Sequence, residues 1–117
     1  MEFNQYNTTV QQWIHTVLEN RETNADVVLE CCRDIIAYGR ETDDSKLMGF
    51  GFFYGGEIYY ELNDGAHFFH MMTEALTYLD RAEEWELVVR CYNFLGIASM
   101  SRGNPSLALD YYMNGLK

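Results

Sequence analysis

His67 and His70 are the residues of this chain whose type and spacing come nearest to a site of chemistry. Two imidazoles three residues apart on one helix can bind the same metal ion, and Glu74 is the only obvious further ligand on that face. A zinc site would need two ligands beyond the histidine pair. The rest of the segment is apolar packing, formed by Phe68, Phe69, Met71 and Met72. We therefore interpret the pair as part of a packed helix and predict no metal site.

The cysteines are the other candidate for chemistry. Cys31 and Cys32 are adjacent and Cys91 is distant in the chain, so there is no CxxC motif. His15 would have to activate one of the thiols, and no nucleophile or oxyanion motif accompanies it. Ordinary buried thiols are the interpretation that we favour. We predict no catalytic residue and no cofactor, and we keep a small metal- or thiol-dependent enzyme as the alternative from another class.

Two further patterns have structural interpretations. The acidic runs at 41–44 and 83–86 lack the spacing of a calcium loop and suit helix starts, where the helix dipole favours negative charge. No lysine–threonine pair follows the glycines among the aromatic residues of 49–56, so they do not form a phosphate loop. We expect these glycines to allow close approach of neighbouring helices: Gly49, Gly51, Gly55 and Gly56.

Composition narrows the class of protein. The 117 residues are enough for one domain with a real core, and 48% of them are hydrophobic, too many for a disordered chain. Eighteen acidic and eight basic residues give a net charge of −10, which makes nucleic acid and anionic membranes poor partners. No apolar run approaches the ~20 residues of a spanning helix, and the N-terminus lacks the pattern of a signal peptide. We expect a cytoplasmic location.

Residues 93–116 have the pattern of two helices joined by a tight turn. Gly103 suits the left-handed position just past a helix end, Asn104 is a good N-cap, and Pro105 suits the first helical position. The second helix carries an apolar face at three-to-four spacing, formed by Ala108, Leu109, Tyr112 and Leu116. The segment therefore predicts a helical hairpin, and it carries the small residues Gly96 and Ala108.

The hairpin recurs at a period of 40 residues. Positions 40 apart carry similar residues: Gly96 and Gly56; Leu116, Leu76 and Ile36; Gly103 and Asn63; Asn104 and Asp64. Self-similarity at such a period is typical of stacked helical repeats. The hairpin, with its Leu-Gly, Gly-Asn, Ala and Tyr-Tyr, resembles a tetratricopeptide repeat, in the longer form similar to the repeats of bacterial regulatory and peptide-sensing proteins. The resemblance implies an all-α fold, a right-handed solenoid of about three antiparallel helical hairpins.

The resemblance covers nearly the whole chain, as a single domain 1–117 with hairpins at about 8–38, 46–79 and 84–117. It is weakest in the first hairpin, where Thr16 stands at the glycine position and Val28 at the alanine position; in the second, Phe68 stands at the alanine position.

Helix boundaries follow from caps and breakers. The expected helices are 8–22, 24–39, 46–63, 65–79, 84–102 and 105–117. Thr8 or Thr9 is expected to cap the first helix, and Gly39 is expected to end the second. The segment 46–63 favours strands by propensity alone, and the repeat register predicts a helix there. Met1–Asn7 is expected to be a loose leader.

In repeats of this kind the first helix of each hairpin lines a concave groove. Carrying those positions over implies these groove residues: Trp13, Val17 and Asn20; Phe53, Glu57 and Tyr60; Arg90, Asn93, Ile97 and Met100. Asn93 can both donate to and accept from a peptide backbone, as asparagines do in related peptide sensors, and Arg90 can pair with a carboxylate. That several of them are core residues instead stays open. The implied function is a non-catalytic regulatory or scaffold module that binds a protein or peptide in the groove.

The last helix is apolar where a terminal repeat needs a polar outer face. Its candidate self-association residues are Leu107, Tyr111, Tyr112 and Leu116. We expect the natural protein to continue beyond Lys117, or this face to pair with a second copy as a homodimer. In bacteria such repeats often precede an output domain, for example a GGDEF-type diguanylate cyclase or a transcription regulator. The alternative function is therefore a dimerisation module for an attached signalling domain.

Overall fold

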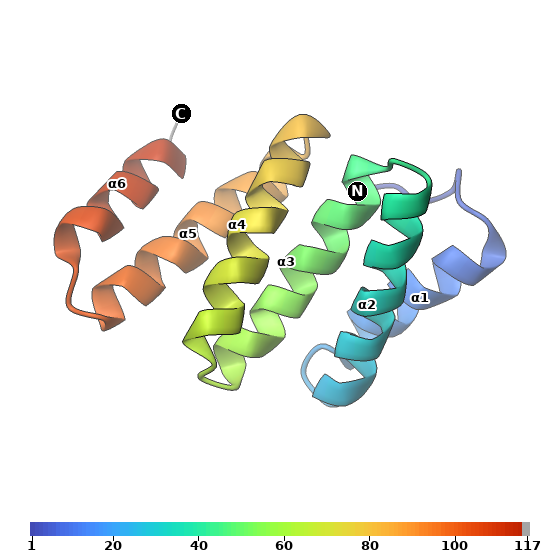
Figure 1. Ribbon diagram of the computed structural model, residues 1–117, viewed down its shortest axis with the longest axis horizontal. Helices are drawn as coiled ribbons and strands as arrows, with labels where there is room; N and C mark the ends of the chain where they lie inside the picture. Colours follow the sequence, from blue (N-terminus) through green and yellow to red (C-terminus); the bar gives the residue numbers. More distant parts are fainter. Residues whose placement is uncertain (116–117) are drawn as a thin grey trace.

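The computed structural model describes residues 1–115, which form six α-helices and no strand (Figure 1). The helices are α1 (Thr8–Asn20), α2 (Ala25–Glu41), α3 (Ser45–Glu61), α4 (Gly65–Arg81), α5 (Trp85–Ser101) and α6 (Pro105–Gly115). Each helix packs against the next, and the chain progresses along the 44 Å long axis from α1 to α6. The predicted all-α class is confirmed.

The turns between helices recur every 20 residues. The helices α2 to α5 each contain 17 residues, and three-residue turns follow each of them. Every one of these turns contains a residue with positive φ: Asp43, Asn63, Glu83 and Gly103. The residue before most helices accepts a hydrogen bond from the third helical N–H, as do Asn24, Asp44, Asp64 and Asn104. The 40-residue period of the sequence is thus a pair of 20-residue helix–turn units.

The helix α3 is the centre of the fold. Every residue from Leu47 to Ile58 is buried, and Figure 1 shows α3 between α2 and α4. A helix that is apolar on all sides is stable only inside a core, and this burial outweighs the strand propensity of its aromatic residues. The helix predicted for this segment is confirmed.

Glycines allow α2 and α4 to approach α3 closely. A Cβ on Gly51 would lie 2.6 Å from Ile36 Cγ1 and 3.0 Å from the Cys32 carbonyl oxygen, both in α2. A Cβ on Gly49 would lie 2.6 Å from Leu79 Cδ2 in α4. A larger residue at either contact requires a neighbouring side chain or the backbone beside it to shift, so the close approach expected for Gly49 and Gly51 is confirmed.

The start of α1 differs from the expectation. Asn7 caps this helix, and its side chain accepts a hydrogen bond from the Val10 N–H. Thr8 and Thr9 are already helical residues. The preference for an asparagine N-cap, stronger than for threonine, accounts for the difference.

The ends of α2 and α4 also lie beyond the expected positions. Gly39 does not end α2; it is buried inside the helix, and its Cβ would lie 2.8 Å from Met48 Cγ. The left-handed position that glycine was expected to fill is taken by Asp43. The helix α2 therefore runs to Glu41, and α4 runs to Arg81.

The core is continuous from α1 to α5 and barely reaches α6. One cluster of buried apolar side chains extends from Val10 to Ala98, while Ala108 is the only buried residue of α6 among the described ones. Leu109 and Met113 are 57% and 55% exposed. No helix within residues 1–115 is long and apolar enough to cross a membrane.

The residues proposed for self-association differ in burial. Leu107 is 37% exposed, and Tyr111 and Tyr112 are half-buried. The ring of Tyr112 packs on Gly96, where a Cβ would lie 2.8 Å from it. Leu116 lies outside the described residues.

Two glycines of α3 give a matched test of this packing. In Gly51→Ala the new methyl meets the Cys32 backbone and Ile36, whereas in Gly55→Ala its one close contact is with the flexible end of Met71, at 2.5 Å, and Cys32 Cβ lies at an ordinary distance of 3.8 Å. Overpacking costs about 1–3 kcal/mol, so Gly51→Ala should be less stable than Gly55→Ala by at least about 1 kcal/mol in urea unfolding. Equal stabilities would mean that the α2–α3 contact is not close.

Candidate functional site

Glu57 is the centre of a charged cluster that joins three helices. This residue of α3 is 9% exposed, and its two carboxylate oxygens each accept a hydrogen bond of 2.8 Å from Arg21. Arg90 of α5 approaches the same carboxylate at 3.4 Å. Because Arg21 directly follows α1, the carboxylate connects the end of α1 to α3 and α5.

Both arginines also lie over aromatic rings of α3. The guanidinium carbon of Arg21 is 4.9 Å from the ring centre of Tyr54, and that of Arg90 is 4.8 Å from the ring centre of Phe53. A buried carboxylate is costly unless it is paired and hydrogen-bonded, and a planar guanidinium can pair with it while stacking on a ring. The hydrogen bonds to Glu57 raise the pKa of Arg21, so this arginine stays charged.

A hollow of about 150 Å³ lies beside this cluster. Its walls come from Leu18 of α1, Phe50 and Tyr54 of α3, Leu87 and Arg90 of α5, the acidic residues Glu84 and Glu86 at the start of α5, and Met1 and Phe3 of the leader. We call this hollow, together with Glu57 and Arg21, the odd-helix groove, because α1, α3 and α5 form it. Figure 1 shows α1 and α5 behind α2 and α4, so the even helices cover another side of the molecule.

The first residues of the chain lie in the odd-helix groove. Phe3 packs edge-on against Phe50, with ring centroids 5.2 Å apart. Lys46 Nζ lies 4.9 Å from the centre of the Phe3 ring and donates a hydrogen bond to the Glu2 carbonyl oxygen. Phe3 and Tyr6 pack against the hydrophobic core. The leader is therefore ordered on the protein and is not loose as expected.

Some of the predicted groove residues come together here. Glu57 and Arg90 are in direct contact, and Phe53 lies fully buried beneath Arg90. Tyr60 packs on Phe94 of α5, with ring centroids 5.4 Å apart. These positions therefore join the second and third hairpins.

The predicted positions on α1 lie apart from the charged cluster. Val17 is fully buried, so its side chain belongs to the core. Trp13 packs edge-on against Tyr38, with ring centroids 6.2 Å apart. The Asn20 side chain donates a hydrogen bond to the Thr16 carbonyl within its own helix.

The remaining predicted positions are at the surface of α5. Asn93 is exposed, and Ile97 and Met100 are 42% and 55% exposed. They follow one another along α5 in the direction of its C-terminus. These side chains can meet a partner without any movement of the core.

Sequence reasoning missed Arg21, Tyr54 and the leader. Arg21 lies past the end of α1, where the repeat register assigns no groove position. A signal for it was nevertheless present, because Glu57 is the only charged residue between Lys46 and Glu61. A lone carboxylate in a buried helix requires a cation from elsewhere in the chain.

The two histidines have separate neighbours. His67 Nδ1 lies 2.8 Å from an Asp64 carboxylate oxygen, and its ring stacks on Tyr59 at 4.8 Å between centroids. His70 meets Phe52 edge-on at 6.4 Å. Within residues 1–115, no three His, Cys, Asp or Glu side chains are grouped so as to hold a metal ion.

The cysteines are buried or half-buried free thiols. Burial raises the pKa of Cys91 to about 12, and it also raises the pKa of Cys31 and Cys32. The thiolate is the reactive form of cysteine, so these side chains are neutral at physiological pH and act in packing.

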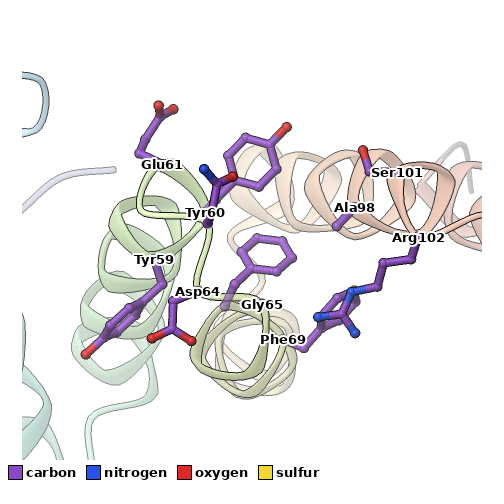
Figure 2. Close-up of a pocket in the computed structure, with 11 residues that line it drawn as sticks. Tyr59, Tyr60, Glu61, Asp64, Gly65, Phe69, Ala98, Ser101 and Arg102 are labelled. Carbon is purple, nitrogen blue, oxygen red and sulfur yellow. The ribbon is translucent and has the colours of Figure 1, made fainter.

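A second hollow, of about 350 Å³, lies between the α3–α4 turn and the end of α5 (Figure 2). The guanidinium carbon of Arg102 is 4.4 Å from the centre of the Phe69 ring. The same guanidinium occupies the space that a Cβ on Gly65 would take. Gly65 therefore makes room for an arginine that closes one side of this hollow, and Tyr60 borders it from α3.

The chain matches no protein-family model, no curated protein and no solved structure.

Replacing Arg21 tests the charged cluster. Arg21→Ala leaves Glu57 with only the longer contact to Arg90. Hydrogen bonds to a charged group are worth about 1.5–3 kcal/mol, so the free energy of unfolding in urea should fall by about 1–3 kcal/mol. The control is Arg33→Ala, an exposed arginine of α2, which should change stability by less than about 0.5 kcal/mol. If both variants are as stable as the parent protein, the cluster does not hold the helices together.

Proposed function

We propose that the chain is a tetratricopeptide-like solenoid module that binds an extended protein segment in the odd-helix groove. The repetition of 20-residue helix–turn units supports the solenoid, because each unit packs on the next. Glu57 contacts both Arg21, which follows α1, and Arg90 of α5. These contacts support a continuous surface across α1, α3 and α5. We assign the module no catalytic step.

The observation that carries this proposal is the position of the leader. A stretch of chain without helical structure already lies on the groove, with one aromatic side chain against α3 and one backbone carbonyl bound by Lys46. Backbone hydrogen bonds combined with side-chain pockets are the usual means by which proteins hold extended peptides. A segment from another protein would meet the same groups.

The groove also has groups that favour particular partners. Arg90 is held over Phe53 and its side chain remains 36% exposed, so it can pair with a carboxylate of the ligand as well as with Glu57. The net charge of −10 favours the approach of segments with a basic overall charge. Apolar side chains and charged groups of both signs line the groove together, so a segment that does not match them leaves charge unpaired, and this selects for sequence.

Selection of peptides by phage display on the immobilised full chain tests this function. We expect enriched peptides that lose at least about tenfold in affinity for Leu18→Glu, which places a charge in the groove and costs about 1.4 kcal/mol or more. Leu18 is 44% exposed, so the substitution spares the core. Ala37→Glu, on the exposed face of α2, is the control and should bind as the parent does.

Two results would contradict the proposal. One is a selection without enriched sequences. The other is a set of peptides whose affinity is unchanged in Leu18→Glu, because such peptides bind elsewhere on the molecule.

A dimerisation module is the second candidate, and the exposed apolar surface at the α6 end favours it. Leu109 and Met113 of α6 and Met100 of α5 are each more than half exposed. Among the described residues of α6, only Asp110 carries a charge. In a chain with 22% charged residues, such a surface suits contact with a second copy, which would bring two attached signalling domains together.

Light scattering on the full chain tests dimerisation. If this face pairs two copies, Leu109→Glu with Met113→Glu should convert a dimer to a folded monomer, whereas Leu62→Glu should leave the dimer intact, because Leu62, 55% exposed, lies in the α3–α4 turn. A monomeric parent protein would exclude this candidate.

A further inference from the structure

The contacts that hold the far end of the leader lie outside the groove. This end is fixed by Asn7, whose side chain caps α1, and by Gln11, which donates a hydrogen bond of 2.7 Å to the Tyr6 carbonyl. The Tyr6 N–H bonds the Phe3 carbonyl at 3.2 Å, which turns the segment back over the groove. The residues before this turn are held by the contacts of the Phe3 ring and by the hydrogen bond from Lys46 to the Glu2 carbonyl oxygen.

These contacts are few and partly exposed to solvent. Phe3 is half-buried, and its ring touches Phe50 on one side and the Lys46 ammonium on another. Met1, beside the hollow, is 40% exposed. Releasing a half-buried ring costs less free energy than releasing a ring sealed in the core, because less apolar area has to be exposed to water.

On the basis of the proposed function, we propose that Phe3 fills the anchor position for the external ligand and that the ligand displaces it. The ligand is an extended segment with an aromatic side chain. Its ring takes the place of Phe3 against Phe50, and the carbonyl of its preceding residue takes the place of Glu2 on Lys46.

The position of Lys46 explains why the ligand has these two features. Its ammonium group faces the aromatic ring and the backbone carbonyl of the adjacent residue at the same time. An ammonium is attracted to the face of an aromatic ring and can also donate hydrogen bonds to carbonyl oxygens. An aliphatic anchor would satisfy only the second of these interactions.

The test uses the full chain and a synthetic probe, the amidated peptide Met-Glu-Phe-Asn-Gln-Tyr-Asn, which copies residues 1–7. Fluorescence anisotropy measures its affinity for the parent protein and for Phe3→Ala. If the leader occupies the groove in about nine molecules of ten, Phe3→Ala should bind the probe about tenfold more tightly, because apparent affinity follows the open fraction. Gln5→Ala, an exposed leader position, is the control and should bind as the parent protein does.

A second probe, in which alanine replaces the phenylalanine, should not bind any of these proteins. Equal affinity of the first probe for the parent and for Phe3→Ala would overturn the proposal, as would tight binding of the alanine probe. Peptides from the phage selection separate this failure from failure of the proposed function. If they are sensitive to Leu18→Glu but indifferent to Phe3→Ala, only the displacement is wrong.

A measurement on the protein that retains Phe3 is independent of any loss of stability in Phe3→Ala. The protein is labelled with fluorophenylalanine, and the Phe3 resonance is identified by its absence in the variant. Saturation with a selected peptide should move this ¹⁹F resonance to the position of a solvent-exposed ring. A Phe3 resonance that stays unchanged while the peptide is bound in the groove would overturn displacement.

Discussion

The burial of α3 on all its sides is the constraint on which the rest of the structure depends. From Leu47 to Ile58 this helix has no face for solvent, so the rest of the chain must enclose it over these residues. The glycines make this possible, because Gly51 lets α2 approach and Gly49 lets α4 approach to distances that a methyl group would prevent. The helices α1 and α5 then complete the enclosure through Arg21, which follows α1, and through Phe94.

The groove follows from this enclosure. The Glu57 carboxylate lies in a buried helix and therefore needs cationic partners. These partners are Arg21, which follows α1, and Arg90 of α5. Their guanidinium groups are then fixed over aromatic rings of α3. The same contacts that stabilise the stack therefore form a charged end of the groove, and the leader packs farther along α3, against Phe50. Stability and recognition share residues here, because Arg90 contacts Glu57 and is also exposed to a ligand carboxylate.

Much of the fold was predictable because the turns carry strong local signals. Asparagine and aspartate are favourable N-caps, and proline is favourable at the first helical position, so helix starts are marked at Asn24, Asp64, Asn104 and Pro105. The all-α class and the helix at 46–63 follow from the spacing of these residues. The end of α2 was misplaced because Gly39 lies inside the helix, where it allows close contact with Met48 of α3. The start of α1 was misplaced because Asn7 is the N-cap in place of Thr8 or Thr9. The site was only partly predictable. Glu57 and Arg90 occupy positions that the 40-residue repeat assigns to a groove, whereas Arg21 occupies no such position. Phe3 reaches the groove through tertiary packing, which leaves no periodic pattern in the sequence.

The most direct test of the central claim is to map a selected peptide onto the full chain by ¹H–¹⁵N NMR. If the odd-helix groove binds extended segments, the largest shift changes on saturation should fall on the amides of Leu18, Tyr54 and Arg90 and on the leader, while α2 residues such as Arg33 and Ala37 stay unchanged. Changes concentrated on α2 and α4, with the leader unmoved, would contradict the account.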